Sequence, residues 1–110
     1  MYDSIRIQLK TGGKNVKHNV PDRVLKDIAV FARRRDVDRV TLFGSRAKGT
    51  NTKRSDIDIA VRGGDFDGFY WDIKEQVHSL LSFDVVDLNS ASDELKKEIE
   101  RSGVTIYEKA

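Results

Sequence analysis

The 110-residue chain contains no cysteine and only one proline. Without cysteine it can form neither a disulfide nor a thiolate metal site, which fits a cytoplasmic protein. No apolar run approaches the roughly 18 residues that a membrane span requires. The first residues lack the apolar segment and small-residue cleavage site of a signal peptide. We therefore expect a single soluble cytoplasmic domain with no membrane partner.

The chain also has no large excess of positive over negative charge. The formal net charge is only +2, and the basic residues form short groups, such as Arg33–Arg35, rather than an extended surface. Short charge runs are usually solvated faces of a protein. A nucleic-acid partner is therefore not expected.

Hydrophobic periodicity predicts an α+β fold. Residues 1–20 form an N-terminal extension with a possible hairpin, and the domain spans residues 21–110. We expect a small, twisted, mixed sheet with helices on one face. The expected elements, in chain order, are helix 22–34, strand 40–43, strand 56–61, helix 66–81, strand 83–88, a helix that begins at 92–94 and stops at Gly103, and edge strand 104–107.

Two aspartates interrupt the strand expected at 56–61. Residues two apart in a strand share a face, so Asp56 and Asp58 lie opposite the core-forming Ile57 and Ile59. Close carboxylates repel each other unless a cation lies between them. Mg²⁺ takes oxygen ligands and often shares them with substrate phosphates, and two such ions can clamp a nucleotidyl transfer. The plainer alternative is that Asp56 caps a turn and Asp58 pairs with a nearby Lys or Arg.

Strand parity selects a third carboxylate from the strand expected at 83–88. Asp84 lies on the face opposite Phe83 and Val85, whereas Asp87 shares their face near the strand end. We therefore expect Asp84 to join the aspartate pair and Asp87 to be a solvated strand terminus.

A Gly44-Ser45 pair follows the strand expected at 40–43 and opens a possible helical turn. Backbone N–H groups at a helix start favour an anion, and Ser45 can add its hydroxyl. The stretch is not a P-loop, because no lysine stands between Gly49 and Thr50. Taken alone, Gly44-Ser45 could equally be an ordinary strand-to-helix turn.

The combination is more specific than its parts. A Gly-Ser pair, ten further residues, Asp-x-Asp and an Asp in a later strand together resemble the nucleotidyltransferase superfamily that includes DNA polymerase β. The string "LFGSRAKG…SDIDIAV" is similar to that of the minimal nucleotidyltransferases, which are often the antitoxin partners of HEPN proteins. The resemblance covers about residues 22–107 and implies a mixed sheet with helices on one side.

The resemblance also implies the chemistry. Asp56 and Asp58 would ligate a divalent metal, most simply two Mg²⁺ ions, and Asp84 would complete the metal site and activate the acceptor hydroxyl. That hydroxyl would attack the α-phosphate of the nucleotide, and pyrophosphate would leave.

The nucleotide contacts follow from the same resemblance. Gly44 and Ser45 would hold the β- and γ-phosphates of ATP or another nucleoside triphosphate. Arg46 and Ser55 are further candidate nucleotide contacts.

Only 26 residues follow Asp84, so we expect the acceptor half of the site to come from a homo-oligomer mate, a separate protein or the acceptor itself. The favoured acceptor is a hydroxyl on a HEPN-type toxin encoded nearby, which this chain would modify with AMP as its antitoxin. The alternatives are transfer to a small molecule or nucleic acid, and a non-catalytic module that neutralises a partner by contact.

Other conspicuous residues favour plainer interpretations. His18 and His78 are isolated, which is typical of surface or packed histidines. The run Phe69-Tyr70-Trp71 must contribute to the core, and leaves Tyr70 or Trp71 for adenine stacking or a protein interface.

Overall fold

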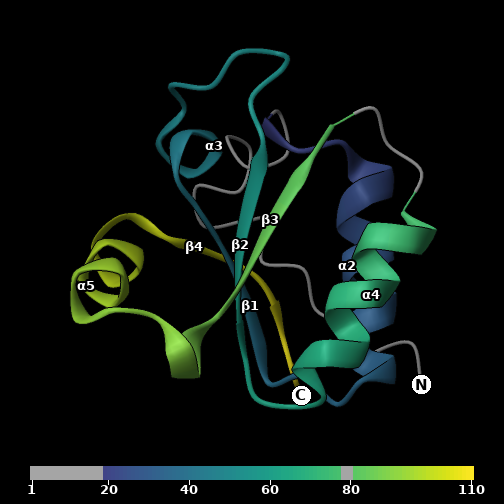
Figure 1. The fold of residues 1–110 in the computed structure, drawn as a ribbon. Coiled ribbons are helices and arrows are strands. Elements are labelled where there is room, and N and C mark those ends of the chain that lie inside the picture. Colours follow the sequence, from purple (N-terminus) through teal and green to yellow (C-terminus); the bar gives the residue numbers. More distant parts are fainter. Residues whose placement is uncertain (1–18, 78–80) are drawn as a thin grey trace.

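The structure, a computed structural model, describes residues 19–77 and 81–110. The hairpin predicted within residues 1–20 falls outside the described residues except for its last two positions, and His18 and His78 lie outside them too. Figure 1 shows a sheet with helices on both sides. The elements are, in chain order, α2 (Asp22–Arg34), β1 (Arg39–Phe43), α3 (Ser45–Lys48), β2 (Ile57–Arg62), α4 (Phe66–Gln76), β3 (Phe83–Asp87), the 3₁₀ turn η2 (Leu88–Ser90), α5 (Asp93–Ser102) and β4 (Val104–Glu108).

The four strands form one mixed sheet in the order β3-β2-β1-β4. β1 is antiparallel to both β2 and β4, whereas β2 and β3 are parallel. A parallel pair needs a crossover connection, which α4 supplies. The predicted α+β class and mixed sheet are confirmed, and β4 lies at an edge as expected.

Helices α2 and α4 cover one face of the sheet (Figure 1). Ile57 and Ile59 of β2 are fully buried there, together with Ile28 of α2 and Phe69 of α4. Full burial of one such side chain contributes about 1.5–3 kcal/mol. The alternation of β2 thus places its isoleucines in the main core, as predicted, and Phe69 is a core residue.

Helix α5 packs against the opposite face of the sheet. Its Ile99 is buried in a second, smaller cluster with Phe43 of β1 and Ala60 of β2. The expectation that helices cover one face holds for α2 and α4 but not for α5. The sheet face that carries Asp58 is therefore partly covered.

Several element boundaries differ from the predictions, most of them strand ends that shift by one residue. The helix expected over residues 66–81 ends at Gln76, and Val77 has extended backbone angles (φ −80°, ψ 116°). β2 begins at Ile57, so Asp56 lies just before the strand. Across residues 19–77 and 81–110, no helix is long and apolar enough to cross a membrane.

Candidate active site

Two of the predicted acidic residues lie side by side on neighbouring strands. Asp58 of β2 is in register with Asp84 of the parallel strand β3, and with Phe43 of β1 on its other side. Paired residues in adjacent strands are about 4.8 Å apart and share a face. Asp58 is half-buried and Asp84 is exposed, so the pair lies at the rim of the sheet face. Asp56, also exposed, lies in the loop that leads into β2.

Gly44 lies directly against Asp58 of this carboxylate pair. A Cβ atom built on Gly44 would stand 2.3 Å from Oδ2 of Asp58, well inside the distance at which such atoms repel. The backbone of Gly44 has φ 73° and ψ −155°, a region that only glycine adopts without strain. The turn after β1 therefore requires glycine both for its backbone angles and for its closeness to Asp58.

Negative charge accumulates around Asp58. Burial raises the pKa of the Asp58 carboxyl above its ordinary value, and the carboxylates of Asp84, Asp56 and Glu98 raise it further. The guanidinium of Arg46 acts in the opposite direction. Among the described residues, neither Asp58 nor its two predicted partners forms an ion pair with Lys or Arg. The alternative in which Asp58 pairs with a neighbouring cation is therefore not seen.

Arg46 is buried and binds the loop that precedes Asp56. Its Nε donates to the carbonyl of Ser55 at 3.1 Å, and its Nη2 donates to the carbonyls of Thr52 and Lys53 at 3.3 Å each. Its Nη1 donates to the carbonyl of Asn19, whose amide donates back to the Arg46 carbonyl at 2.5 Å. Three of the four guanidinium bonds thus hold residues 52–55. The side chain predicted to contact nucleotide is engaged with the protein backbone.

The two serines of the motif occupy different settings. Ser45 is half-buried at the start of α3, directly after Gly44, and its carbonyl accepts the N–H of Thr50 at 3.0 Å. Ser55 closes the loop instead, because its Oγ accepts the N–H of Thr52 at 2.9 Å. Ser45 therefore directly follows the glycine that contacts Asp58, and Ser55 shapes the turn before Asp56.

The remaining carboxylate of β3 lies outside this group. Asp87 caps η2, with its Oδ1 accepting the N–H of Asn89 at 3.0 Å. Parity thus separated Asp84 from Asp87 as the structure does. The aromatic run of α4 lies on the other side of the sheet (Figure 1) and also divides, since Tyr70 is half-buried and Trp71 is 57% exposed.

The carboxylates do not form a closed metal cage. In the described portion of the chain, no three His, Cys, Asp or Glu side chains lie close enough together to hold an ion by themselves. Two adjacent carboxylates, one of them Asp58 with its raised pKa, nevertheless fit a hard cation that completes its shell with water and phosphate oxygens. The donor set therefore suits Mg²⁺ brought in with a nucleotide.

Two features of the site escaped the sequence reasoning. Glu98 of α5 adds a fourth carboxylate near Asp58, and it also pairs with Lys48 of α3 at 3.6 Å. Its approach depends on α5 crossing the Asp58 face, which the sequence did not indicate. The second feature is the set of hydrogen bonds from Arg46 to the 52–55 loop. Their acceptors are backbone carbonyls, which every residue carries, so the sequence does not indicate them.

Comparison with known families matches this geometry. The family model described as "Polymerase beta, Nucleotidyltransferase" covers residues 26–110. The chain belongs to this family. The match spans both strands of the carboxylate pair and the Gly44-Ser45 turn.

Individual relatives of the chain include a protein adenylyltransferase and a toxin–antitoxin protein of known structure. The protein adenylyltransferase MntA of Shewanella oneidensis is 39% identical over 72 residues, which are 62% of this chain and 52% of MntA. The chain thus spans about half the length of that curated relative. A crystal structure of a toxin–antitoxin with AMP-PNP has a TM-score of 0.61 at 31% identity, covering 74% of this chain and 70% of the other.

A second solved structure is that of an MntA–HpeT toxin–antitoxin mutant. Two aspartates spaced two positions apart are replaced by glutamate in that protein. Its TM-score is 0.60 at 29% identity, again over 74% of this chain and 70% of the other.

Proposed function

We propose that this nucleotidyltransferase-family chain transfers AMP from ATP to a hydroxyl group on a HEPN-type toxin, and so acts as an antitoxin. The observation that carries the proposal is the pairing of Asp58 with Asp84 on adjacent strands, directly against Gly44. The likeness to MntA and to toxin–antitoxin structures supports the protein acceptor.

The acidic residues would form the metal site. Asp58 and Asp84, with Asp56 from the adjoining loop, would hold Mg²⁺. When bound, the metal neutralises phosphate charge and positions the reacting groups. These neighbouring carboxylates repel one another and form no ion pair within residues 19–77 and 81–110, and this negative charge supplies the attraction for the cation.

The turn after β1 would receive the triphosphate. Gly44 brings the backbone within contact of Asp58, and Ser45 follows with its hydroxyl and N–H. The close approach allows phosphate oxygens to lie beside the carboxylate pair, where a side chain at position 44 would otherwise intrude. Ser55 and Arg46 would act through the shape of the 52–55 loop.

The reaction balances without a further reactant. The acceptor oxygen forms a bond to the α-phosphorus, the bond from that phosphorus to the bridging oxygen breaks, and pyrophosphate leaves. Asp84 would accept the hydroxyl proton, because it is the exposed member of the pair and an acceptor can reach it. The products are an AMP ester on the partner and pyrophosphate.

The proposal is tested with the purified chain, its HEPN-type neighbour-gene product, Mg²⁺ and ATP labelled on the α-phosphate. We expect label on the partner, and loss of that label with Asp58→Asn. Asp87→Asn is the matched control, because it removes a carboxylate from β3 outside the site. Partner binding is measured in parallel. Full neutralisation of the partner by the Asp58→Asn chain would establish contact as the mechanism and contradict the proposal.

A further inference from the structure

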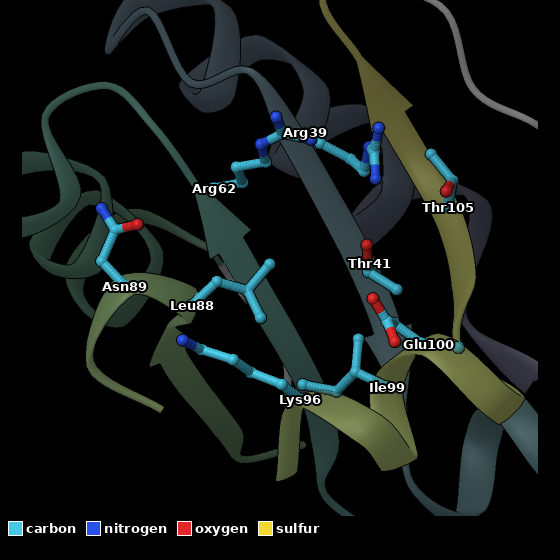
Figure 2. Close-up of a pocket in the computed structure, with 10 residues that line it drawn as sticks. Arg39, Thr41, Arg62, Leu88, Asn89, Lys96, Ile99, Glu100 and Thr105 are labelled. Atoms are coloured by element: carbon cyan, nitrogen blue, oxygen red, sulfur yellow. The ribbon is translucent and has the colours of Figure 1, made fainter. Parts of the chain in front are cut away.

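A cavity lies on the same sheet face as Asp58, at the other end of that face. It has a volume of about 470 Å³ and is enclosed by β1, the end of β2, η2, α5 and β4. Figure 2 shows Arg39 and Arg62 together at one end, with Leu88 and Ile99 below them. Cavities of this size accommodate small organic ligands rather than single ions.

The cavity is separate from the candidate active site. Asp58 and Arg62 share a face of β2 and are four residues apart, a distance of about 13 Å along a strand. Between them on β2 lies the buried Ala60, with Phe43 beside Asp58 and Ile99 in the lining of the cavity. One face of the sheet thus presents carboxylates at one end and cations at the other.

The lining carries an excess of positive charge. Three cationic side chains, Arg39, Arg62 and Lys96, face a single acid, Glu100, so the lining has a net charge of +2. Within residues 19–77 and 81–110, neither Arg62 nor Lys96 forms an ion pair. Glu100 is exposed, so it can turn towards solvent when an anion enters.

Arg39 is partly paired and partly exposed. Its Nη2 contacts Glu108 at 3.3 Å on the surface, but its Nε is buried with no hydrogen-bond partner. No other buried side-chain nitrogen or oxygen of the described residues is left unpaired in this way. Because almost no solvent reaches this Nε, a ligand in the cavity would meet the Arg39 guanidinium only on its exposed side, where the side chain is 38% accessible.

The same cavity offers neutral donors and an apolar floor. Thr41 and Thr105 bring hydroxyl groups from neighbouring strands, and Leu88 and Ile99 bring apolar surface (Figure 2). Guanidinium groups and hydroxyls together suit the oxygens of a phosphate, and the apolar surface suits a larger body attached to it.

We propose that this cavity binds a small organic phosphate monoester, with its phosphate between Arg39 and Arg62 and its body against Leu88 and Ile99. The inference does not rest on the proposed nucleotidyl transfer, because it uses none of the residues of that site.

The test is a titration of the full chain, kept free of metal with EDTA and followed by amide and methyl NMR. The probes are AMP, inorganic phosphate and adenosine. We expect AMP to shift the resonances of Thr41, Thr105 and Leu88 saturably, and to bind more tightly than phosphate or adenosine. Signals of Gly44 and Ser45 report the other site in the same spectra.

Charge variants make the test specific. Arg62→Gln removes an exposed side chain of the cavity and should weaken AMP about tenfold, the effect of losing one charged hydrogen bond. Glu100→Gln should strengthen binding. Arg101→Gln removes the same charge from the exposed side of α5 and should change the affinity by less than about twofold, since only screened charge is lost.

Several results would overturn the proposal. One is the absence of any saturable shift at Thr41 and Thr105 with AMP. Another is binding that shifts only Gly44 and Ser45. A third is equal weakening by Arg62→Gln and Arg101→Gln, which would show a non-specific charge effect. None of these results bears on transfer of AMP to a partner, so the two proposals fail independently.

Discussion

Replacing Gly44 with alanine should disable the candidate site more than it destabilises the fold. The added Cβ would lie 2.3 Å from Oδ2 of Asp58, whereas ordinary contact begins near 3.4 Å. The Asp58 carboxylate or the turn must therefore move by about 1 Å. A misplacement of about 1 Å can cost a reaction about 100-fold. We expect nucleotidyl transfer to fall by about that factor or more.

Gly49 provides the matched control. It also has a positive φ, 79°, but a Cβ added there would meet nothing within 4 Å. Gly49→Ala should therefore cost about 1–2 kcal/mol of folding free energy through backbone strain alone, with transfer retained. Gly44→Ala should cost about 1–3 kcal/mol, because its backbone angles suit only glycine.

Both variants are compared by urea denaturation and by transfer of labelled AMP to the partner. The decisive quantity is activity measured at a temperature where both variants are fully folded. If Gly44→Ala keeps the activity of Gly49→Ala, contact between position 44 and the Asp58 carboxylate has no role in the reaction, and the assignment of the site is refuted.

Three further predictions concern stability. Arg46→Met should lower the free energy of unfolding by about 2–4 kcal/mol in urea denaturation, because it leaves several carbonyls of the 52–55 loop without a donor. Asp58→Asn should raise the melting temperature of the metal-free protein at neutral pH. The Asp58 pKa is raised on folding, so its ionisation opposes folding above that pKa, and the gain from Asp58→Asn should disappear as the pH falls through its unfolded value. Asp72→Asn should destabilise the protein at neutral pH. Its hydrogen bond with Arg35, 2.8 Å long, lowers the Asp72 pKa, so the loss should vanish in acid, once Asp72 is protonated in the folded wild-type chain. Equal melting temperatures of wild type and each variant across the pH range would contradict the last two.

The local pattern of the sequence was sufficient for the carboxylate pair. Alternation in the strand from residue 57 fixes Ile57 and Ile59 on one face and Asp58 on the other, and the same rule separates Asp84 from Asp87. Because β2 and β3 are parallel and Asp58 is in register with Asp84, the two side chains that parity places on this face lie next to each other. The family resemblance indicated the chemical roles of these residues, and strand parity identified Asp84 as the carboxylate that lies beside Asp58.

Long-range packing was beyond the sequence. Helix α5 buries only Ile99, so its sequence does not indicate which sheet face it covers. The end of α4 was misplaced because Val77 continues the apolar spacing of the helix, and no glycine or proline marks the stop at Gln76. Arg46 was predicted as a candidate nucleotide contact, yet it is buried and its guanidinium donates to the carbonyls of the 52–55 loop.

Mass spectrometry of the toxin partner after incubation with this chain, ATP and Mg²⁺ tests the central claim most directly. The account predicts an added AMP on a hydroxyl side chain with wild-type protein, none with Asp58→Asn, and undiminished modification with Asp87→Asn. A partner that binds the wild-type chain yet carries no AMP, or that is modified equally by the Asp58→Asn chain, would contradict it.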